Sequence, residues 1–294
     1  MEQLPSIRFA IIHPVEAERT AWASRLHRAT ITQFDDLQHF ASRTSTFDLV
    51  MLSTSHDQRT ALDLLLAQTH LLLVADHVPT ESDLASRYAD AHANGVQTVV
   101  VNPDRYLPSR QLIRRQLGST LGEPGLIRMH QWLPEVNASD FSHHLVRDLD
   151  LILWLSSRLP DRVFAIEQSE NESLGRYLQV HLGFPGGGMA LLDLTNRLPG
   201  GDGYASLSVI AASGAAYADD HHNMQLLYRG DRPHLLRTDE RTRQYAAIAQ
   251  EAIDAILAKR DFSTGLTEWR NAWNVAAAVE RSIKSGQAVA PGGH

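Results

Sequence analysis

The residues with the clearest capacity for chemistry lie in one helix-length stretch, HHLVRDLDLILWL, at positions 143–155. His143 and Arg147 are four residues apart, and that spacing places two side chains on one face of an α-helix. An imidazole can exchange a proton near neutral pH, whereas a guanidinium stays charged and can clamp a carboxylate or phosphate. The slightly favoured alternative is structural, with Arg147 in a surface network with Asp148 and Asp150, or with Asp150 accepting from a buried amide.

A run of four polar residues, Asp219-Asp220-His221-His222, is the other group with metal-ligand chemistry. Neighbouring strand residues point to opposite faces of a sheet, so only alternate members of the run can converge. A structural zinc site needs about four ligands, and no second pair stands at a familiar spacing. We therefore interpret the run as a polar turn between strands and expect no metal site.

The composition limits the function classes. The chain has 294 residues, a net charge of −7 and no cysteine. It is long enough for two cores, but it offers no basic surface for a nucleic-acid backbone and no thiolate nucleophile or ligand. The N-terminus lacks the basic segment of a signal peptide, and no apolar run is long enough to span a bilayer. We expect a cytoplasmic protein with no nucleic-acid or membrane partner, and a frayed tail from residue 286 onward.

Strands and helices alternate through the first hundred residues. Apolar runs predict buried parallel strands, and helical patterns separate them, so this order predicts a shortened Rossmann-like parallel α/β domain over residues 1–103. The expected strands are 7–12, 30–34, 47–53, 71–75 and 96–102, and the expected helices are 16–27, 35–42, 58–68 and 80–93.

The pattern changes after Pro103. Strands now follow one another with glycine-rich breaks between them, which predicts an antiparallel sheet. We expect an α+β domain with an open, mainly antiparallel sheet over residues 104–294. Its expected strands are 125–133, 163–168, 176–183, 189–196, 204–211, 224–228 and 233–236, and its helices are 109–117, 143–155, 242–258 and 266–285.

This order of elements resembles the Gfo/Idh/MocA family, whose members are NAD(P)-dependent oxidoreductases that act mostly on sugars and cyclic polyols. Local motifs carry the resemblance along nearly the whole chain. The segment RDLDLILWL at 147–155 is similar to the family's His-Asp-Ile-Asp helix with its trailing Trp-Leu. The other motifs are VVVNPDRYLP at 99–108, LIRRQLGSTLGEPGLI at 112–127 and AWNVAAAVERSIKSGQ at 272–287.

The resemblance implies a dinucleotide site, with a glycine-rich turn after the first strand and an acidic ribose-binding residue about twenty residues later. The turn here reads HPVEAE at 13–18, so it has no glycine, it contains a proline without an amide donor, and its two glutamates repel phosphate. One strand–helix unit is missing, so 30–34 corresponds to either the second or the third family strand. The cofactor-binding candidates are Asp35, Thr54 and Arg105, of which Asp35 is better explained as a helix cap.

The catalytic residues that the resemblance implies are replaced as well. The stretch equivalent to the family's Glu-Lys-Pro motif reads ADHVP at 75–79, where His77 is a candidate proton donor. The general-acid histidine of the family corresponds to Arg147, which cannot relay a proton at neutral pH. A shift of three residues would bring His144 to that place but would lose the Trp-Leu match.

Two functions are consistent with these departures. We favour a pseudo-oxidoreductase that has lost hydride transfer, and that binds a small anionic or sugar-like ligand or serves as the partner subunit of an active enzyme. The alternative is a diverged enzyme that oxidises a CH–OH group of a sugar or cyclic polyol with NAD or NADP. The resemblance also implies a homodimer, or a complex with an active paralogue, through the C-terminal sheet.

Overall fold

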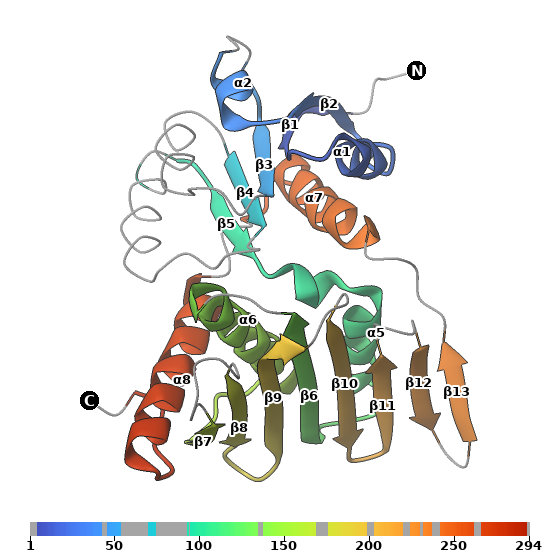
Figure 1. Cartoon of the computed structure of the whole chain (residues 1–294). Helices are drawn as coiled ribbons and strands as arrows, with labels where there is room; N and C mark the ends of the chain where they lie inside the picture. The colour runs from blue at the N-terminus through green and yellow to red at the C-terminus, as the bar shows by residue number, and fades with distance from the viewer. Residues whose placement is uncertain are drawn as a thin grey trace. The chain divides into compact units, whose positions relative to one another are not determined.

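A computed structural model of the chain describes two compact units. The first comprises Met1–Leu107 and Glu240–Thr267, and the second comprises Pro108–Asp239 and Glu268–His294. Each unit is built around one sheet (Figure 1). The described residues are 5–42, 46–53, 70–74, 93, 95–134, 138–168, 176–198, 203–219, 224–229, 232–236, 242–261 and 266–292.

The first unit contains a five-stranded sheet in the order β2-β1-β3-β4-β5. Every neighbouring pair of strands is parallel, which confirms the Rossmann-like class. The helix expected at 58–68 and nearly all of the one expected at 80–93 lie outside the described residues. The elements are β1 (Ile7–Ile12), α1 (Glu16–Ala23), β2 (Ala29–Phe34), α2 (Leu37–Ala41), β3 (Leu49–Ser53), β4 (His70–Val74), β5 (Thr98–Val101), the 3-10 helix η1 (Pro103–Tyr106) and α7 (Thr242–Leu257).

The position of β2 shows whether the segment at 30–34 corresponds to the second or the third strand of the family fold. β2 pairs directly with β1, and β3 pairs with the other side of β1. In the usual Rossmann order 3-2-1-4-5-6, the second strand occupies this place. β2 is therefore the second strand, and the edge strand beyond it is the one that is absent from the described sheet.

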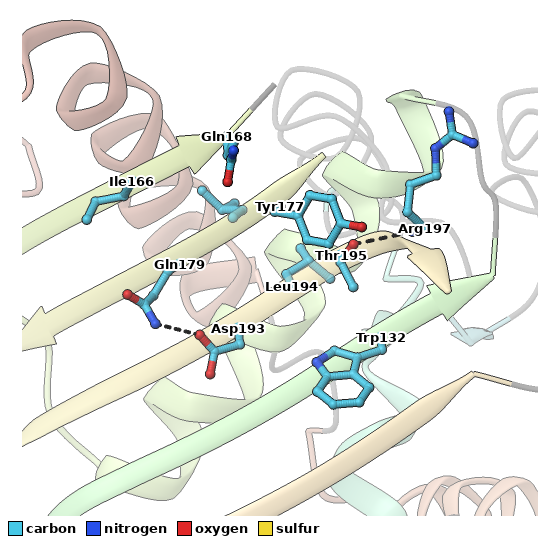
Figure 2. Close-up of a pocket in the computed structure, with 10 residues that line it drawn as sticks. Trp132, Ile166, Gln168, Tyr177, Gln179, Asp193, Leu194, Thr195 and Arg197 are labelled. Carbon is cyan, nitrogen blue, oxygen red and sulfur yellow. Dashed lines mark hydrogen bonds between the residues drawn. The ribbon is translucent and has the colours of Figure 1, made fainter. Parts of the chain in front are cut away.

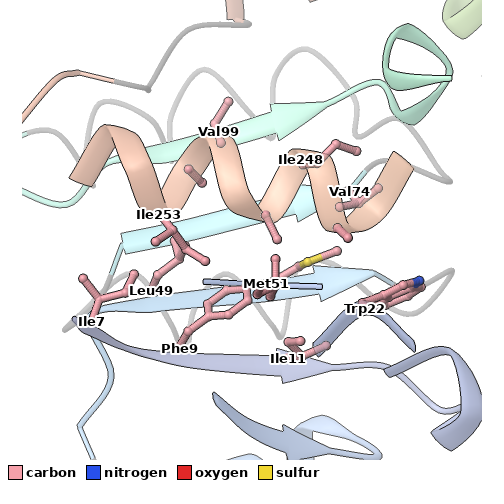
Figure 3. Packing of buried hydrophobic residues seen from close by; sticks show 14 residues of the cluster. Ile7, Phe9, Ile11, Trp22, Leu49, Met51, Val74, Val99, Ile248 and Ile253 are labelled. Atoms are coloured by element: carbon pink, nitrogen blue, oxygen red, sulfur yellow. The ribbon is translucent and has the colours of Figure 1, made fainter. Parts of the chain in front are cut away.

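The core of the first unit includes a helix from the far end of the sequence. Ile248 and Ile253 of α7 are buried against Phe9 and Met51 of the sheet (Figure 3). The division at residue 103 assigned α7 to the second domain, whereas its apolar face packs on the first sheet. Burial of such side chains stabilises the unit by roughly 1.5–3 kcal/mol each.

The second unit contains an eight-stranded sheet in the order β13-β12-β11-β10-β6-β9-β8-β7. The pair β6–β9 is parallel and the other pairs are antiparallel, so the mainly antiparallel class is confirmed. The elements are α5 (Pro108–Leu117), β6 (Pro124–Pro134), α6 (Ala138–Ser156), β7 (Arg162–Gln168), β8 (Tyr177–Gly183), β9 (Met189–Leu198), β10 (Tyr204–Ala211), β11 (Gly214–Asp219), β12 (Met224–Arg229), β13 (Arg232–Leu236) and α8 (Leu266–Ser285).

The tail after α8 is paired, so the expectation of a frayed end is wrong as far as Val289. The backbone N–H and C=O groups of Val289 bond to those of Val163 on β7, at 2.9 and 2.8 Å. The fully buried Ser282 hydroxyl accepts from the Ala165 amide at 3.0 Å and donates to the Gln287 carbonyl at 2.6 Å. These bonds occupy backbone groups that an edge strand would otherwise expose.

Candidate functional site

The turn between β1 and α1 is where a Rossmann fold would hold the pyrophosphate of a dinucleotide. The His13 amide donates to the Phe34 carbonyl of β2 at 3.1 Å. His13 Nε2 lies 3.1 Å from Glu18 Oε2, and the His13 ring lies 4.7 Å from the Trp22 ring. The buried Arg19 donates from its guanidinium to the His13 carbonyl, so this cation is directed at the backbone.

This turn does not fit a pyrophosphate. Positions 13 and 18 correspond to the first and third glycines of the usual fingerprint, and here their side chains meet each other. Glu16 and Glu18 place two carboxylates in the first turn of α1, the position that a bound phosphate would use. No residue of the turn has a positive φ, so the backbone does not take the conformation for which glycine is selected.

Asp35 follows β2 at the same sheet edge and occupies the position of a ribose-binding acid. Its side chain is 60% exposed, and its Oδ1 lies 2.8 Å from His39 Nδ1. The hydrogen bond from His39 lowers the pKa of the Asp35 carboxyl. The helix cap is Asp36, which accepts from the His39 amide at 2.7 Å, so the assignment of the cap to Asp35 is wrong by one residue. Asp35 thus remains available to a ligand hydroxyl.

The other candidates of the first unit contribute less. The cofactor candidate Thr54 and the candidate proton donor His77 both lie outside the described residues. Arg105 is half-buried in η1, where the Asn102 side chain caps the helix by accepting from the Asp104 amide at 3.0 Å. Within the first unit, the described positions gathered at the β1–β2 edge are therefore those of His13, Glu18 and Asp35.

Three of the four candidate catalytic residues lie on α6 of the second unit. His143, His144 and Arg147 are half-buried. Asp148 and Asp150 are 2% and 1% exposed, so the interpretation of these two carboxylates as part of a surface network is wrong. Both aspartates therefore belong to the interior of the unit, where a carboxylate needs polar partners.

The polar run at 219–222 lies mostly outside the described residues. Asp219 ends β11 and is buried, and the Tyr217 hydroxyl donates to its Oδ2 at 3.5 Å. Among the residues that the structure describes, no group of three His, Asp or Glu side chains is placed to hold a metal ion. No described helix is long and apolar enough to cross a membrane.

A cavity that sequence reasoning did not find lies on the second sheet, on the face opposite the buried Leu192 and Val180. It has a volume of about 540 Å³ (Figure 2). We call it the outer-face trough. Its lining residues are Trp132, Ile166, Gln168, Tyr177, Leu178, Gln179, Asp193, Leu194, Thr195 and Arg197. Alternating residues along the strands indicate the two faces of the sheet. Which residues meet on one face depends on the cross-strand register, which the sequence does not reveal.

Comparison with solved structures finds proteins with a similar fold. UDP-N-acetylglucosamine 3-dehydrogenase from Acidithiobacillus ferrooxidans is 16% identical, with a TM-score of 0.74 over 96% of this chain and 99% of that one. Scyllo-inositol dehydrogenase from Lactobacillus casei, with bound NAD(H) and scyllo-inositol, is 12% identical, with a TM-score of 0.70 over 98% and 100%. A levoglucosan dehydrogenase in complex with NADH and L-sorbose is 10% identical, with a TM-score of 0.78 over 98% and 99%.

No protein-family model matches the sequence, and no curated protein matches it. At these identities the likeness to solved structures concerns the fold. The chain has the two-domain fold of Gfo/Idh/MocA-type oxidoreductases, as the resemblance implied.

Proposed function

We propose that this protein is a pseudo-oxidoreductase that has lost hydride transfer and retains the fold for binding a small ligand or for acting as a partner subunit, in the cytoplasm. The main support for this proposal is the contact between His13 and Glu18 across the β1–α1 turn. It fills the space where a pyrophosphate would approach the backbone and leaves carboxylates at the helix N-terminus. Arg147, in the place of the family's catalytic histidine, agrees with the loss of proton transfer.

The alternative is a diverged NAD(P)-dependent oxidoreductase that acts on a CH–OH group of a sugar or cyclic polyol. Asp35 supports it, because an exposed carboxylate follows the second strand where a ribose would bind. The solved structures with NAD(H) or NADH and a polyol or sugar support it as well. In this alternative the cofactor is held mainly through its ribose, without the usual contacts to its pyrophosphate.

The discriminating experiment is a thermal unfolding series with NAD⁺, NADH, NADP⁺ and NADPH. A specific dinucleotide at a hundred times its Kd stabilises the folded protein by about 2.7 kcal/mol. We expect no shift with any of the four. A shift that is lost in Asp35→Ala and kept in Asp36→Asn would favour the oxidoreductase, as would steady NADH formation with scyllo-inositol as substrate.

The ligand role can be tested separately at α6. A bidentate guanidinium suits a carboxylate or phosphate, and a lysine keeps the charge but loses the fork. We expect Arg147→Ala to weaken the binding of a small anion such as tartrate or inorganic phosphate, with Arg147→Lys retaining part of the affinity. Equal binding of the anion by the parent and by the Arg147→Ala protein would contradict the role of Arg147 as an anion clamp.

The partner role rests on exposed apolar side chains of the outer sheet face. Met189 and Ile210 are 53% and 55% exposed, and both are in register with residues at the same end of β6. Large exposed apolar groups on one face are typical of association surfaces. We expect sedimentation to show a homodimer, or a complex with an active paralogue, that Met189→Asp disrupts. A monomer at all concentrations, alone and with the paralogue, would contradict this role.

A further inference from the structure

β2 is an edge strand of the first sheet (Figure 1). It pairs with β1 along its whole length, from Ala29 to Phe34, and no described strand pairs with its other side. In the usual Rossmann order, the third strand covers that other side of the second strand. Because the third strand is absent from the described sheet, one side of β2 is open.

The hydrogen bonds to β1 determine which backbone groups of β2 point to the open side. The Ile7 amide donates to the Arg28 carbonyl, and the His13 amide donates to the Phe34 carbonyl, each at 3.1 Å. The even-numbered residues of this segment therefore direct their amide and carbonyl groups to β1, because these directions alternate along a strand. The odd-numbered residues point outward, and among the described residues their backbone groups have no hydrogen-bond partner. They are Ala29, Ile31 and Gln33.

The sequence of β2, ATITQF at 29–34, carries no protection of an open edge. Soluble proteins usually protect an edge strand with a charged side chain, a proline or a β-bulge. β2 has no charged residue and no proline, and its register with β1 is continuous. Its threonine, isoleucine and phenylalanine residues favour strand formation. The edge is therefore suited to accept a further strand.

The two ends of β2 carry opposite charges. His27 and Arg28 are exposed immediately before the strand, and Asp35 and Asp36 are exposed immediately after it. A second copy of β2 in antiparallel orientation brings its acidic end beside the basic end of the first copy. A parallel copy would bring like charges together, which is destabilising. The charges therefore favour an antiparallel second copy as the added strand.

We propose that β2 pairs with β2 of a second copy of this chain, antiparallel and with Ile31 on the two-fold axis. In this register Ala29 of each copy faces Gln33 of the other, and the two Ile31 residues face each other. Every outward amide and carbonyl of β2 then has a partner. A displacement by two residues would leave some of these groups unpaired. The pairing joins the two sheets into one continuous sheet.

This interface belongs to the first unit, so it goes beyond the proposed function and is separate from the association through the second sheet. Thr30 of each copy faces Thr32 of the other at a non-hydrogen-bonded position, and threonine pairs across strands are favourable. The contact involves one strand from each copy. It is therefore smaller than a standard interface of roughly 1,200–2,000 Å², and we expect the association to depend on protein concentration.

The test uses introduced cysteines, because the chain has none of its own. Facing residues at a non-hydrogen-bonded position have Cα atoms about 4.5 Å apart, which a disulfide can bridge. Mild oxidation of an equimolar mixture of Thr30→Cys and Thr32→Cys proteins should give a disulfide-linked dimer, whereas each protein alone should stay largely monomeric. Thr20→Cys, at an exposed position of α1, is mixed with Thr30→Cys as the control for random collision. All proteins also carry Met189→Asp, which removes the association through the second sheet.

Two charge variants test the same register without a covalent bond. Thr30→Glu/Thr32→Glu places like charges opposite each other, whereas Thr30→Glu/Thr32→Lys places opposite charges there. Both threonines are exposed, so the fold should tolerate either variant. Sedimentation should show a dimer of the Met189→Asp protein at high concentration. We expect its Kd to rise at least roughly tenfold in the Glu/Glu variant and to stay near the parent value in the Glu/Lys variant.

Three results would overturn the proposal. One is equal cross-linking in the Thr30→Cys/Thr32→Cys mixture and in the Thr20→Cys control. Another is cross-linking of Thr32→Cys alone to the same extent as the mixture, which would place the axis at Thr32. The third is a Met189→Asp protein that stays monomeric at all concentrations. Because Met189→Asp is present throughout, none of these results bears on the association through the second sheet, which the parent protein tests.

Discussion

His13 and Glu18 meet across the turn between β1 and α1, with Nε2 and Oε2 3.1 Å apart. Behind them the Trp22 ring lies 4.7 Å from the His13 ring and also stacks on Tyr245 of α7 at 4.7 Å. The turn is therefore closed by the exposed Glu18 and by His13, whose ring packs against Trp22 of the core of the first unit. The closed shape of the turn depends on several packed side chains. We therefore expect that opening the turn requires more than one substitution.

The first prediction concerns a variant that opens this turn, His13→Gly/Pro14→Ala/Glu18→Gly. It removes the bridging side chains and one carboxylate, and it restores an amide donor at position 14. We expect NADH to stabilise the variant by about 0.4 kcal/mol when NADH is at its Kd, and to leave the parent unchanged. Thermal unfolding with and without NADH measures this. An equal shift in the parent would mean that the closed turn does not exclude the cofactor.

The second prediction is a loss of stability of the first unit in acid, through His70 of β4. Burial lowers the pKa of the His70 imidazole, and the charge of Asp48 only partly opposes this effect. His70 Nδ1 also accepts from the Gln97 amide at 3.0 Å, which requires that nitrogen to be unprotonated. The unfolded chain therefore binds a proton at a higher pH than the folded chain, near 6.5.

The stabilising effect of His70 is accordingly present above pH 6.5 and is lost as the pH falls from there through the folded-state pKa. In His70→Asn the amide oxygen can still accept from Gln97, but it does not titrate. Urea unfolding at pH 7.5 and 5.5 should show a smaller difference for His70→Asn than for the parent. His27→Asn, at an exposed position, is the matched control and should keep the parent's pH dependence.

The third prediction concerns the hydrogen bond between Tyr106 of η1 and Glu251 of α7, 2.8 Å long. Burial, together with the neighbouring carboxylate, raises the pKa of the Tyr106 hydroxyl. A raised pKa means that stability is complete below the unfolded value of about 10 and declines as the pH rises above it. We expect Tyr106→Phe to cost about 0.5–1.5 kcal/mol at pH 7 and to flatten the decline above pH 10.

The matched control for Tyr106→Phe is Tyr217→Phe in the second unit, whose hydroxyl pKa is also raised, chiefly by burial. Trp22 lies in the first unit. Replacing Trp22 with Phe in one series removes its fluorescence signal, so tryptophan fluorescence then distinguishes the unfolding of the first unit from that of the second. If Tyr106→Phe leaves the alkaline decline of the first unit unchanged, the hydrogen bond to Glu251 is not its cause.

The sequence predicts those elements whose own residues determine them. Continuous apolar runs located β1 and β3 because a buried parallel strand is apolar on both faces. β11 was missed because GAAYAD, at 214–219, has small side chains and little β-propensity, and it forms through pairing with β10 and β12. The assignment of α7 failed for a related reason, since an amphipathic pattern does not specify which sheet its apolar face covers.

The candidate sites could also be predicted from the sequence only in part. The absence of glycine at 13–18 was visible in the sequence, but the contact of His13 with Glu18 depends on the direction of two side chains in the folded turn. The outer-face trough was invisible because Trp132, Tyr177 and Asp193 come from three strands. Their convergence depends on a register that long-range pairing fixes.

The last prediction concerns Ser282 of α8, the residue that connects the tail to the edge of the second sheet. Its fully buried hydroxyl accepts from the Ala165 amide and donates to the Gln287 carbonyl. Ser282→Ala removes both bonds and leaves a buried amide without a partner, so we expect a loss of about 1–3 kcal/mol in the free energy of unfolding of the second unit. Ser285→Ala removes only two long bonds, of 3.4 and 3.3 Å, at an exposed position, so it is the matched control and should change this free energy little. Hydrogen exchange gives a local readout: the Ala165 and Val289 amides should exchange faster in Ser282→Ala alone, whereas unchanged exchange at Ala165 would show that another group protects this edge.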